Sequence, residues 1–266
     1  MSWTGCGPRS VVRHNGRVPR TLAVANQKGG VAKTTTVATL GAALTELGQR
    51  VLVVDADPQA CLTFSVGIDP EDLDKSIHDV LLGGIKARDV LVEFDDAPDL
   101  LPATIELATA EVQLAREGSP EQVLRTALRP LRSSYDWIIV DCPPTLGLLT
   151  VNGLSAASDV LIPLQCETLA HRGVGQLLDT VHDVQRLTNP GLRVLGVLPT
   201  LYDGRTTHAR AVLETIADTY SLDVLAPAIP KSIRFAEAPA IGETVLSTSP
   251  ASPGAKAYRA LAGALL

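Results

Sequence analysis

Two short apolar runs on either side of a helix-forming segment constrain the fold of this chain more than any other feature. Residues 21–25 (TLAVA) and 51–54 (VLVV) are typical of buried strands, and residues 34–47 between them indicate a helix that Gly48 ends. The pattern predicts a βαβ unit, which belongs in a parallel sheet that helices cover on both faces.

The alternation of strands and helices continues along the chain. Further strands are predicted at residues 137–140, 160–164 and 194–198, and further helices near 174–186, 205–220 and 255–265. Gly83, Gly84 and Pro98 interrupt residues 71–132, where we expect helices and one short strand. At 266 residues, 45% of them hydrophobic, the chain is long enough for one large α/β domain.

Charge is distributed unevenly along the chain. Residues 1–20 hold four of the 23 Lys and Arg residues and none of the 29 acidic residues, which leaves 19 basic against 29 acidic residues in 21–266. We interpret residues 1–20 as a disordered basic leader and residues 21–266 as the folded domain. Because the folded part is acidic, any contact with DNA must come from a local basic patch.

Neither the cysteines nor the apolar segments indicate a metal site or a membrane span. The four cysteines form no C-x-x-C pair and show no zinc-site spacing. No segment approaches the roughly 18 uncharged apolar residues of a transmembrane helix. The sequence therefore predicts a soluble, cytoplasmic protein with reduced, mostly buried thiols.

A glycine-containing loop follows the first predicted strand, where the next helix begins. Its backbone N–H groups and the positive end of the helix would bind phosphate oxygens, while Lys33 adds a full charge and Thr34 offers a hydroxyl to Mg²⁺. The strict G-x-x-x-x-G-K-[ST] pattern fails at Gln27 and Ala32. The residues predicted to bind nucleotide are Lys28, Gly29, Gly30, Val31, Ala32, Lys33, Thr34 and Thr35.

Acidic residues stand at the ends of two predicted strands. Asp55 and Asp57 follow the strand at 51–54, and Asp141 follows the strand at 137–140. Open α/β folds bind ligands at this edge of the sheet, so one of the first two acids can organise metal waters while the other polarises an attacking water. Asp141 has the form of a Walker B acid that holds Mg²⁺ through water. The alternative for Asp55 and Asp57 is that both cap the following segment.

These motifs resemble those of the ParA/Soj partition ATPases within the ParA/MinD group. Lys28 matches the extra lysine of the deviant Walker A loop K-G-G-x-x-K-[ST]-T. The loop departs from the usual family sequence K-G-G-V-G-K-T-T at one position, where Ala32 replaces the glycine before Lys33. Residues 54–59 (VDADPQ) match V-D-x-D-P-Q, and residues 141–144 (DCPP) match D-x-P-P. The resemblance extends from about residue 21 to the end.

The resemblance implies a single P-loop NTPase domain with a twisted, mostly parallel sheet of about eight strands and helices on both faces. It implies that Lys28 reaches across a nucleotide-bridged homodimer, that Lys33 holds phosphate and that Asp57 has the hydrolytic role. Thr34, Asp55 and Asp141 would hold Mg²⁺, the last two through water. ATP is favoured over GTP, because no Asn-Lys-x-Asp motif occurs. Hydrolysis is expected to be slow and to be stimulated by a ParB-like partner.

The resemblance also implies a DNA surface and a cellular role. Arg205 and Arg234 match arginines that contact non-specific DNA in the chromosomal relatives, with Lys231 and Arg210 near them. The alternative is that each arginine pairs with a nearby acid, since surface ion pairs are common. The expected role is chromosome or plasmid partitioning or intracellular positioning, with association to the nucleoid when ATP is bound.

Three other functions remain for comparison. A MinD-like protein would need a basic amphipathic tail after its last helix, whereas this chain stops at Leu266 and has only Lys256 and Arg259 in its last predicted helix, so stable membrane anchoring is not expected. The nitrogenase iron protein needs two cluster cysteines per subunit, which the sequence does not supply. A nucleotide-gated positioning adaptor with little catalysis, for a division or polarity protein, is the alternative that stays open.

Overall fold

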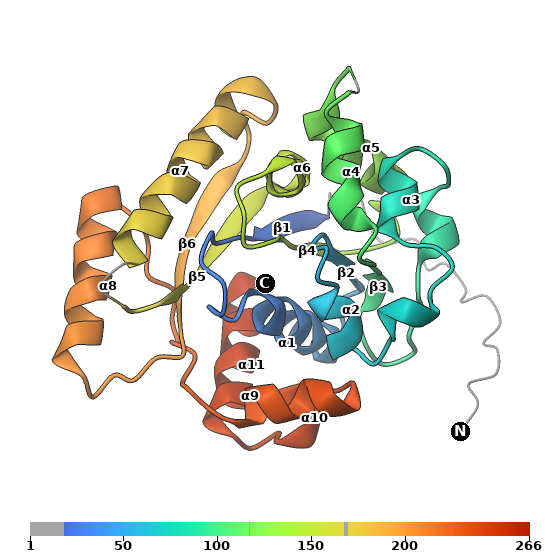
Figure 1. Ribbon diagram of the computed structural model, residues 1–266. Coiled ribbons are helices and arrows are strands. Elements are labelled where there is room, and N and C mark those ends of the chain that lie inside the picture. The colour runs from blue at the N-terminus through green and yellow to red at the C-terminus, as the bar shows by residue number, and fades with distance from the viewer. Residues whose placement is uncertain (1–18, 117, 168–169) are drawn as a thin grey trace.

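Six parallel strands form the sheet in the part of the chain that the computed structural model describes, residues 19–116, 118–167 and 170–266 (Figure 1). Their order is β3-β2-β4-β1-β5-β6, and every neighbouring pair is parallel. The carboxyl ends of β1, β2 and β4 are therefore adjacent. The strands are β1 (Arg20–Val24), β2 (Val51–Asp55), β3 (Asp99–Leu101), β4 (Trp137–Asp141), β5 (Asp159–Gln165) and β6 (Arg193–Thr200).

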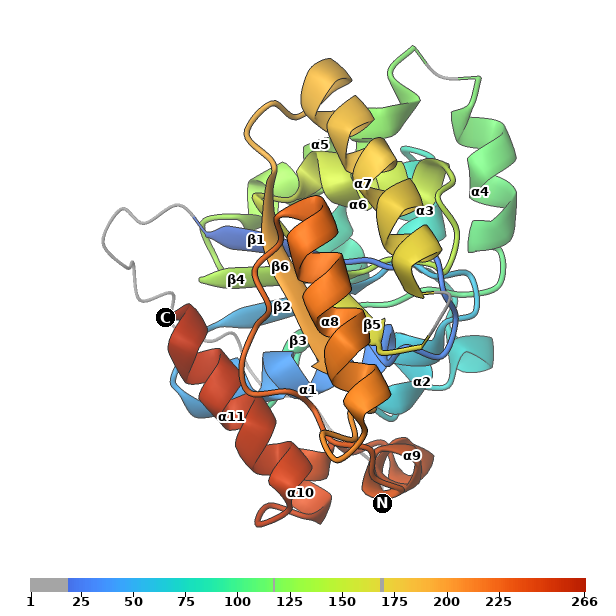
Figure 2. The ribbon, with the colours of Figure 1, turned by 90° about the vertical axis from the view of Figure 1, so that its left-hand side faces the viewer.

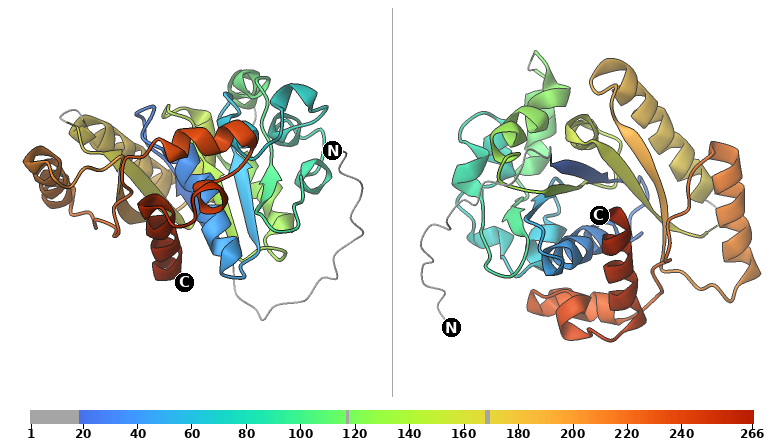
Figure 3. Two further views of the ribbon diagram at one scale, coloured as in Figure 1. Left: turned by 90° about the horizontal axis from the view of Figure 1, so that it is seen from below. Right: turned by 180° about the vertical axis from the view of Figure 1, so that it is seen from behind.

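Helices connect the strands and cover both faces of the sheet. Figure 2 shows α1, α10 and α11 on one side and α5, α6 and α7 on the other, while α8 lies outside α7 at the β6 edge (Figure 3). The α-helices are α1 (Lys33–Glu46), α2 (Cys61–Ser65), α3 (Ile77–Leu81), α4 (Leu107–Leu114), α5 (Val123–Leu128), α6 (Leu148–Ala156), α7 (Ala170–Leu187), α8 (Thr207–Tyr220), α9 (Arg234–Glu237), α10 (Val245–Thr248) and α11 (Pro253–Leu265). The 3₁₀ helices are η1 (Pro70–Asp72), η2 (Ala87–Val90), η3 (Pro120–Gln122), η4 (Arg129–Leu131) and η5 (Ala238–Ile241).

Two apolar cores lie on the two faces of the sheet. Successive side chains of a strand point to opposite faces, and β1 supplies both cores in this way. Leu22 and Val24 pack in the core that contains Leu40 of α1 and Tyr258 of α11, whereas Ala23 packs in the core on the other face. Burial on both faces explains why the strand sequences are continuous apolar runs without alternation.

The predicted α/β class and the predicted elements are confirmed. The first helix spans Lys33–Glu46 and ends next to Gly48, as its sequence indicates. The largest difference at a helix start is α7, which begins at Ala170 instead of Val174. The irregular region, residues 71–132, contains helices and the single strand β3, as predicted.

The predicted count of about eight strands is wrong for the described residues, which hold six strands in one sheet. The segments that would extend the sheet beyond β6 make single bridges only, Val197 with Val224 and Tyr202 with Pro230. Pro227 and Pro230 interrupt this segment, and proline has no N–H to continue a ladder of hydrogen bonds. The chain therefore runs beside β6 without forming a regular strand.

The predicted boundary between leader and domain falls inside β1. Residues 1–18 of the predicted leader lie outside the described residues, but Arg20 is the first residue of β1. Its guanidinium donates to the carbonyl oxygen of Leu265 at 2.7 Å, lies 3.5 Å from the Asp159 carboxylate and stacks 4.7 Å from the ring centroid of Trp137. These contacts make Arg20 part of β1, one residue before the predicted start of the domain at residue 21.

No helix in the described part of the chain combines the length and apolar character needed to cross a bilayer. Cys61, Cys142 and Cys166 are free thiols, and of these only Cys142 is buried, so the expectation of mostly buried thiols holds for one of the three. The described residues contain no group of three or more metal-ligating side chains gathered in space. Cys6 lies outside the described range.

Gly196 in β6 offers a test of how tightly the strand packs. It has φ +136°, and a Cβ there would stand 2.4 Å from the carbonyl oxygen of Asp223, which already accepts the N–H of Val197. Gly196→Ala should lower the free energy of unfolding by at least about 2 kcal/mol, measured by urea denaturation. Gly263→Ala is the matched control, since nothing lies within 4 Å of its Cβ position in α11. That control should raise stability by up to about 1 kcal/mol; equal effects of the two changes would contradict the packing argument.

Candidate nucleotide-binding site

The loop between β1 and α1 is anchored by side chains from its own start and from β6. The Nδ2 of Asn26 donates to the carbonyl oxygen of Pro163 at 2.7 Å, and its Oδ1 accepts the N–H of Lys28 at 3.0 Å. The hydroxyl of Thr200 donates to the carbonyl oxygen of Val31 at 2.9 Å. Sequence reasoning missed Asn26 and Thr200, and the signal that could have found them is a polar residue at the end of a buried strand.

Ala32 occupies a strained backbone conformation at the start of α1. Its φ of 64° and ψ of 36° lie in the left-handed region, which costs an L-residue about 1–2 kcal/mol relative to glycine. The N–H and the hydroxyl of Thr36 both donate to its carbonyl oxygen, at 2.9 and 2.7 Å. The Thr36 hydroxyl also contacts the hydroxyl of Tyr258 in α11, at 2.9 Å. The strict motif has glycine at this position for the same backbone reason.

Lys33 brings a buried positive charge into the loop. Its side chain is 7% exposed, and its Nζ donates to the carbonyl oxygen of Lys28 at 3.2 Å. Burial lowers the pKa of Lys33, and the negative charges of Asp141 and Asp57 act in the opposite direction. The charge of the Lys33 ammonium is therefore stabilised by the two nearby carboxylates.

Asp141 at the end of β4 contacts the loop directly. The hydroxyl of Thr34 donates to Asp141 Oδ2 at 2.6 Å, while Asp141 Oδ1 is buried and has no hydrogen-bond partner among the described residues. Burial and the neighbouring Asp55 raise the pKa of Asp141 well above its usual value. A hydroxyl beside an unsatisfied buried carboxylate oxygen supplies the hard oxygen donors that Mg²⁺ prefers, so these residues fit a divalent cation.

Asp55 and Asp57 both make the capping contacts that their turn context allows. Asp55 Oδ2 accepts the N–H and the hydroxyl of Thr63, at 2.8 and 2.7 Å, and its Oδ1 accepts the N–H of Asp57 at 3.2 Å. Burial outweighs these bonds and raises the pKa of Asp55 to about 6. Asp57 Oδ1 accepts the N–H of Gln59 at 2.9 Å, which leaves its second oxygen without a described donor. Asp57 thus accepts fewer hydrogen bonds than Asp55 and has an oxygen available for another donor.

Lys28 is paired with a residue outside its own loop. Its ammonium forms an ion pair with Glu167, a residue that sequence reasoning did not select. The two side chains are 37% and 51% exposed. An exposed pair of this kind contributes about 0–1 kcal/mol, so a stronger anion could displace Glu167 at little cost.

The predicted DNA-binding residues lie on two segments that the fold brings together. The N–H of Tyr202 donates to the carbonyl oxygen of Ile229 at 2.9 Å, which places the turn that carries Arg205 beside the segment that carries Lys231 and Arg234. Both arginines are paired with acids of their own segments. Arg205 contacts both carboxylate oxygens of Asp203, at 2.9 and 2.8 Å, and Arg234 contacts Glu237 at 3.0 Å. The arginine of the first pair lowers the pKa of Asp203 to about 2.

The fold and the loop define a P-loop nucleotide-binding domain, and comparison with known proteins gives its family. A family model described as an AAA domain matches residues 19–194. The chain is 45% identical over 243 residues to the chromosome-partitioning ATPase Soj of Thermus thermophilus, covering 91% of this chain and 94% of that protein. It is 43% identical over 242 residues to the sporulation initiation inhibitor protein Soj of Bacillus subtilis, covering 91% of this chain and 96% of that protein. This chain belongs to the ParA/Soj family.

A solved structure with a different name is also similar. The structure described as cobyrinic acid a,c-diamide synthase from Mycobacterium smegmatis, with a bound ATP analogue and magnesium, superimposes with a TM-score of 0.84. It is 57% identical and covers 93% of this chain and 94% of that one. The similarity thus covers nearly the whole of both chains.

Asp141→Asn tests the buried carboxylate at the loop. A folded-state pKa above the unfolded value of 3.8 means that the carboxylate destabilises the protein at high pH, and that this cost disappears as pH falls through the folded-state pKa. In EDTA at pH 8 the variant should therefore be at least as stable as wild type, with a gain in the free energy of unfolding of about 1 kcal/mol or more if the full cost is removed. Any gain should vanish near pH 4, where the wild-type carboxylate is protonated. Urea denaturation at the two pH values measures it. A variant less stable by the same amount at both pH values would contradict the argument.

Proposed function

We propose that this chain is an ATP-dependent, dimerising ATPase of the ParA/Soj type that acts in chromosome or plasmid partitioning or in intracellular positioning. The observation that carries the proposal is the contact of Thr34 with Asp141 beside Lys33, at the start of α1. A hydroxyl, a carboxylate with one unsatisfied oxygen and a buried ammonium match the needs of a magnesium nucleotide. The M. smegmatis relative is described with an ATP analogue and magnesium bound.

The proposed hydrolysis uses the residues around this contact. Loop amides and Lys33 would hold the phosphates, Thr34 would hold Mg²⁺ directly, and Asp141 and Asp55 would hold it through water. Asp57 orients the water that attacks the γ-phosphate, and its uncommitted oxygen is available for that bond. Water adds to the γ-phosphorus as the bond from that phosphorus to the bridging oxygen breaks, which gives ADP, inorganic phosphate and a proton, and Lys33 would neutralise charge on the departing ADP.

Dimerisation would use the exposed ion pair of Lys28. We infer that Lys28 leaves Glu167 and contacts the phosphates of a second subunit when ATP bridges the two, because a phosphate carries more charge than the carboxylate that it replaces. Turnover would then be slow in the isolated chain and faster with a ParB-like activating protein, which completes or tightens the site. In this proposal the protein resides in the cytoplasm.

DNA binding would follow from the dimer. Arg205, Arg234 and Lys231 of one subunit make few phosphate contacts, and doubling them raises affinity steeply. The two arginine pairs are exposed and cost little to break, so DNA phosphates can replace Asp203 and Glu237. ATP would thereby control when the protein stays on the nucleoid.

Two alternatives have separate tests. A positioning adaptor with little catalysis would bind ATP and dimerise without releasing phosphate, with or without DNA, in a malachite-green assay. The name of the M. smegmatis structure, which is 57% identical, raises a second candidate, ATP-dependent amidation of cobyrinic acid. Phosphate release that requires cobyrinic acid and an ammonia source would favour that reaction, and release that is indifferent to both would favour the ParA-type ATPase.

The Asp57→Ala variant tests the dimer. With hydrolysis blocked, it should form dimers in saturating Mg-ATP and remain monomeric in Mg-ADP, as measured by multi-angle light scattering. Adding Lys28→Ala should abolish the dimer, because the cation that would cross the interface is gone. Single subunits in Mg-ATP for Asp57→Ala itself would refute the proposed function.

Ala32→Gly tests the strained start of the loop. Glycine adopts φ near 64° without the cost that alanine bears, and it removes a methyl group from the phosphate side of the loop. We expect the variant to bind Mg-ATP as tightly as wild type or up to about tenfold more tightly. Isothermal calorimetry measures the affinity, and markedly weaker binding would contradict this account of the loop.

Arg234→Glu tests the DNA surface. The variant should bind DNA about tenfold or more weakly in ATP, and the slope of log affinity against log salt should fall by about 2 for a dimer that loses two phosphate contacts. Arg186→Glu is the matched control, since Arg186 is also exposed and paired three residues away, with Asp183 at 2.9 Å. Normal DNA retention by Arg234→Glu would end the proposal for this surface.

A further inference from the structure

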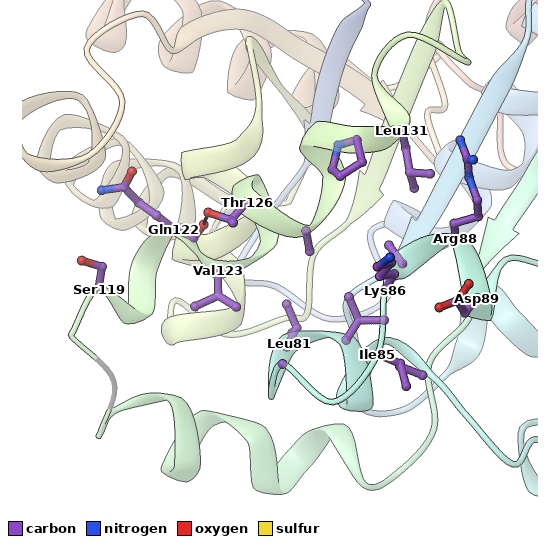
Figure 4. Close-up of a pocket in the computed structure, with 15 residues that line it drawn as sticks. Leu81, Ile85, Lys86, Arg88, Asp89, Ser119, Gln122, Val123, Thr126 and Leu131 are labelled. Atoms are coloured by element: carbon purple, nitrogen blue, oxygen red, sulfur yellow. Dashed lines mark hydrogen bonds between the residues drawn. The ribbon is translucent and has the colours of Figure 1, made fainter.

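A cavity of about 960 Å³ lies between the α3–η2 segment and the η3–α5–η4 segment, lined by none of the residues assigned to the nucleotide site (Figure 4). Apolar side chains form its middle, including Leu81, Ile85, Val123 and Leu131. Charged residues lie at one end and polar residues at the other. The charged end has Lys86, Arg88 and Asp89, and the polar end has Ser119 and Gln122.

The two segments that form the cavity are basic in an otherwise acidic chain. Residues 80–90 and 119–132 contain five basic and two acidic residues, a local formal charge of +3, whereas the whole chain carries −6. Lys86, Arg88 and Arg129 are exposed, and none of them lies within ion-pair distance of a carboxylate of the described residues. The basic charge here is therefore available to a ligand.

We propose that this cavity is a docking site for an acidic, amphipathic segment of a partner protein. Apolar side chains of the segment would enter between Leu81, Ile85 and Val123, and its carboxylates would contact Lys86 and Arg88. The apolar lining is concave, so it receives side chains and cannot insert into a membrane. The apolar lining also makes no favourable contact with phosphate groups, which disfavours a nucleic acid as the occupant.

A hydrogen-bonded side chain links the cavity to the segment that follows β4. Asn152 of α6 accepts the N–H of Leu124 at 3.0 Å and donates to the carbonyl oxygen of Pro120 at 2.7 Å. It is 1% exposed. Val123 on the cavity wall is thus held between two backbone groups that α6 fixes, and α6 begins seven residues after Asp141. An occupant would act on the Asp141 segment through this contact, although the binding proposal itself does not depend on hydrolysis of ATP.

The test uses the full chain and a fluorescein-labelled amphipathic peptide with Leu and Phe on one helical face and Glu on the other. Fluorescence anisotropy should show saturable binding. A peptide of the same composition in permuted order, which has no apolar face, should bind about tenfold or more weakly, as should the peptide in which Lys replaces Glu. Hydrogen exchange should show protection of residues 119–131 when the amphipathic peptide is added.

Two kinds of variant separate the cavity from general electrostatic attraction. Lys86→Glu/Arg88→Glu should weaken peptide binding about tenfold or more, and Thr126→Trp, which fills the cavity and keeps every charge, should do the same. Lys256→Glu/Arg210→Glu, with one change in α11 and one in α8, is the charge-matched control outside the cavity lining and should bind as wild type does.

Several results would overturn the proposal. These are no saturable binding, equal binding by the cavity variants and the control, or hydrogen-exchange protection that leaves out residues 80–90 and 119–131 and appears only elsewhere. Binding of the wild-type chain to phosphatidylglycerol vesicles or to duplex DNA that the cavity variants abolish, without peptide binding, would assign the surface to that other occupant and so reject a protein segment.

Discussion

The hydrogen bond between Thr34 and Asp141 is the contact on which the rest of the site depends. The two residues are 107 positions apart in sequence, and they meet only because β4 pairs with β1 in the sheet. That pairing needs the crossover helices on both faces and the apolar cores under them. The result is a buried carboxylate with one unsatisfied oxygen at the mouth of the loop, and this arrangement destabilises the empty protein. A bound cation would remove that cost, so cation binding would stabilise the folded protein.

Local sequence predicted the elements around the site well, because the pattern there is strong. A buried strand, a loop with Gly29 and Gly30 and a helix starting at Lys33 follow from residue types within one short window. The contacts that hold the loop did not follow from it. Asn26 bonds to Pro163 and Thr200 bonds to Val31, and partners so far apart in sequence are set by the strand order. The count of about eight strands was implied by the family resemblance, and it was wrong because the segment beside β6, which Pro227 and Pro230 interrupt, makes only single bridges.

Three ion pairs occupy the surfaces that the family resemblance assigns to function. Lys28 with Glu167, Arg205 with Asp203 and Arg234 with Glu237 are all partly or fully exposed. The sequence left open the alternative that each arginine pairs with a nearby acid, and both arginines make such pairs in this single chain. Such pairs are weak in water, so each cation can exchange its carboxylate for a ligand at little cost in free energy. Sequence could not decide between pairing and ligand binding, because the same side chain can do each in a different state of the protein.

The bond network from Ala32 through Thr36 to Tyr258 has a consequence for how the protein is made. Tyr258 lies in α11, which the ribosome synthesises more than 200 residues after the loop. Until that helix packs against α1, the hydroxyl of Thr36 lacks its second partner and the strained turn at Ala32 lacks the support behind it. A nascent chain would therefore emerge with its phosphate loop unfinished and would acquire a competent loop only after α11 has been made and has packed against α1.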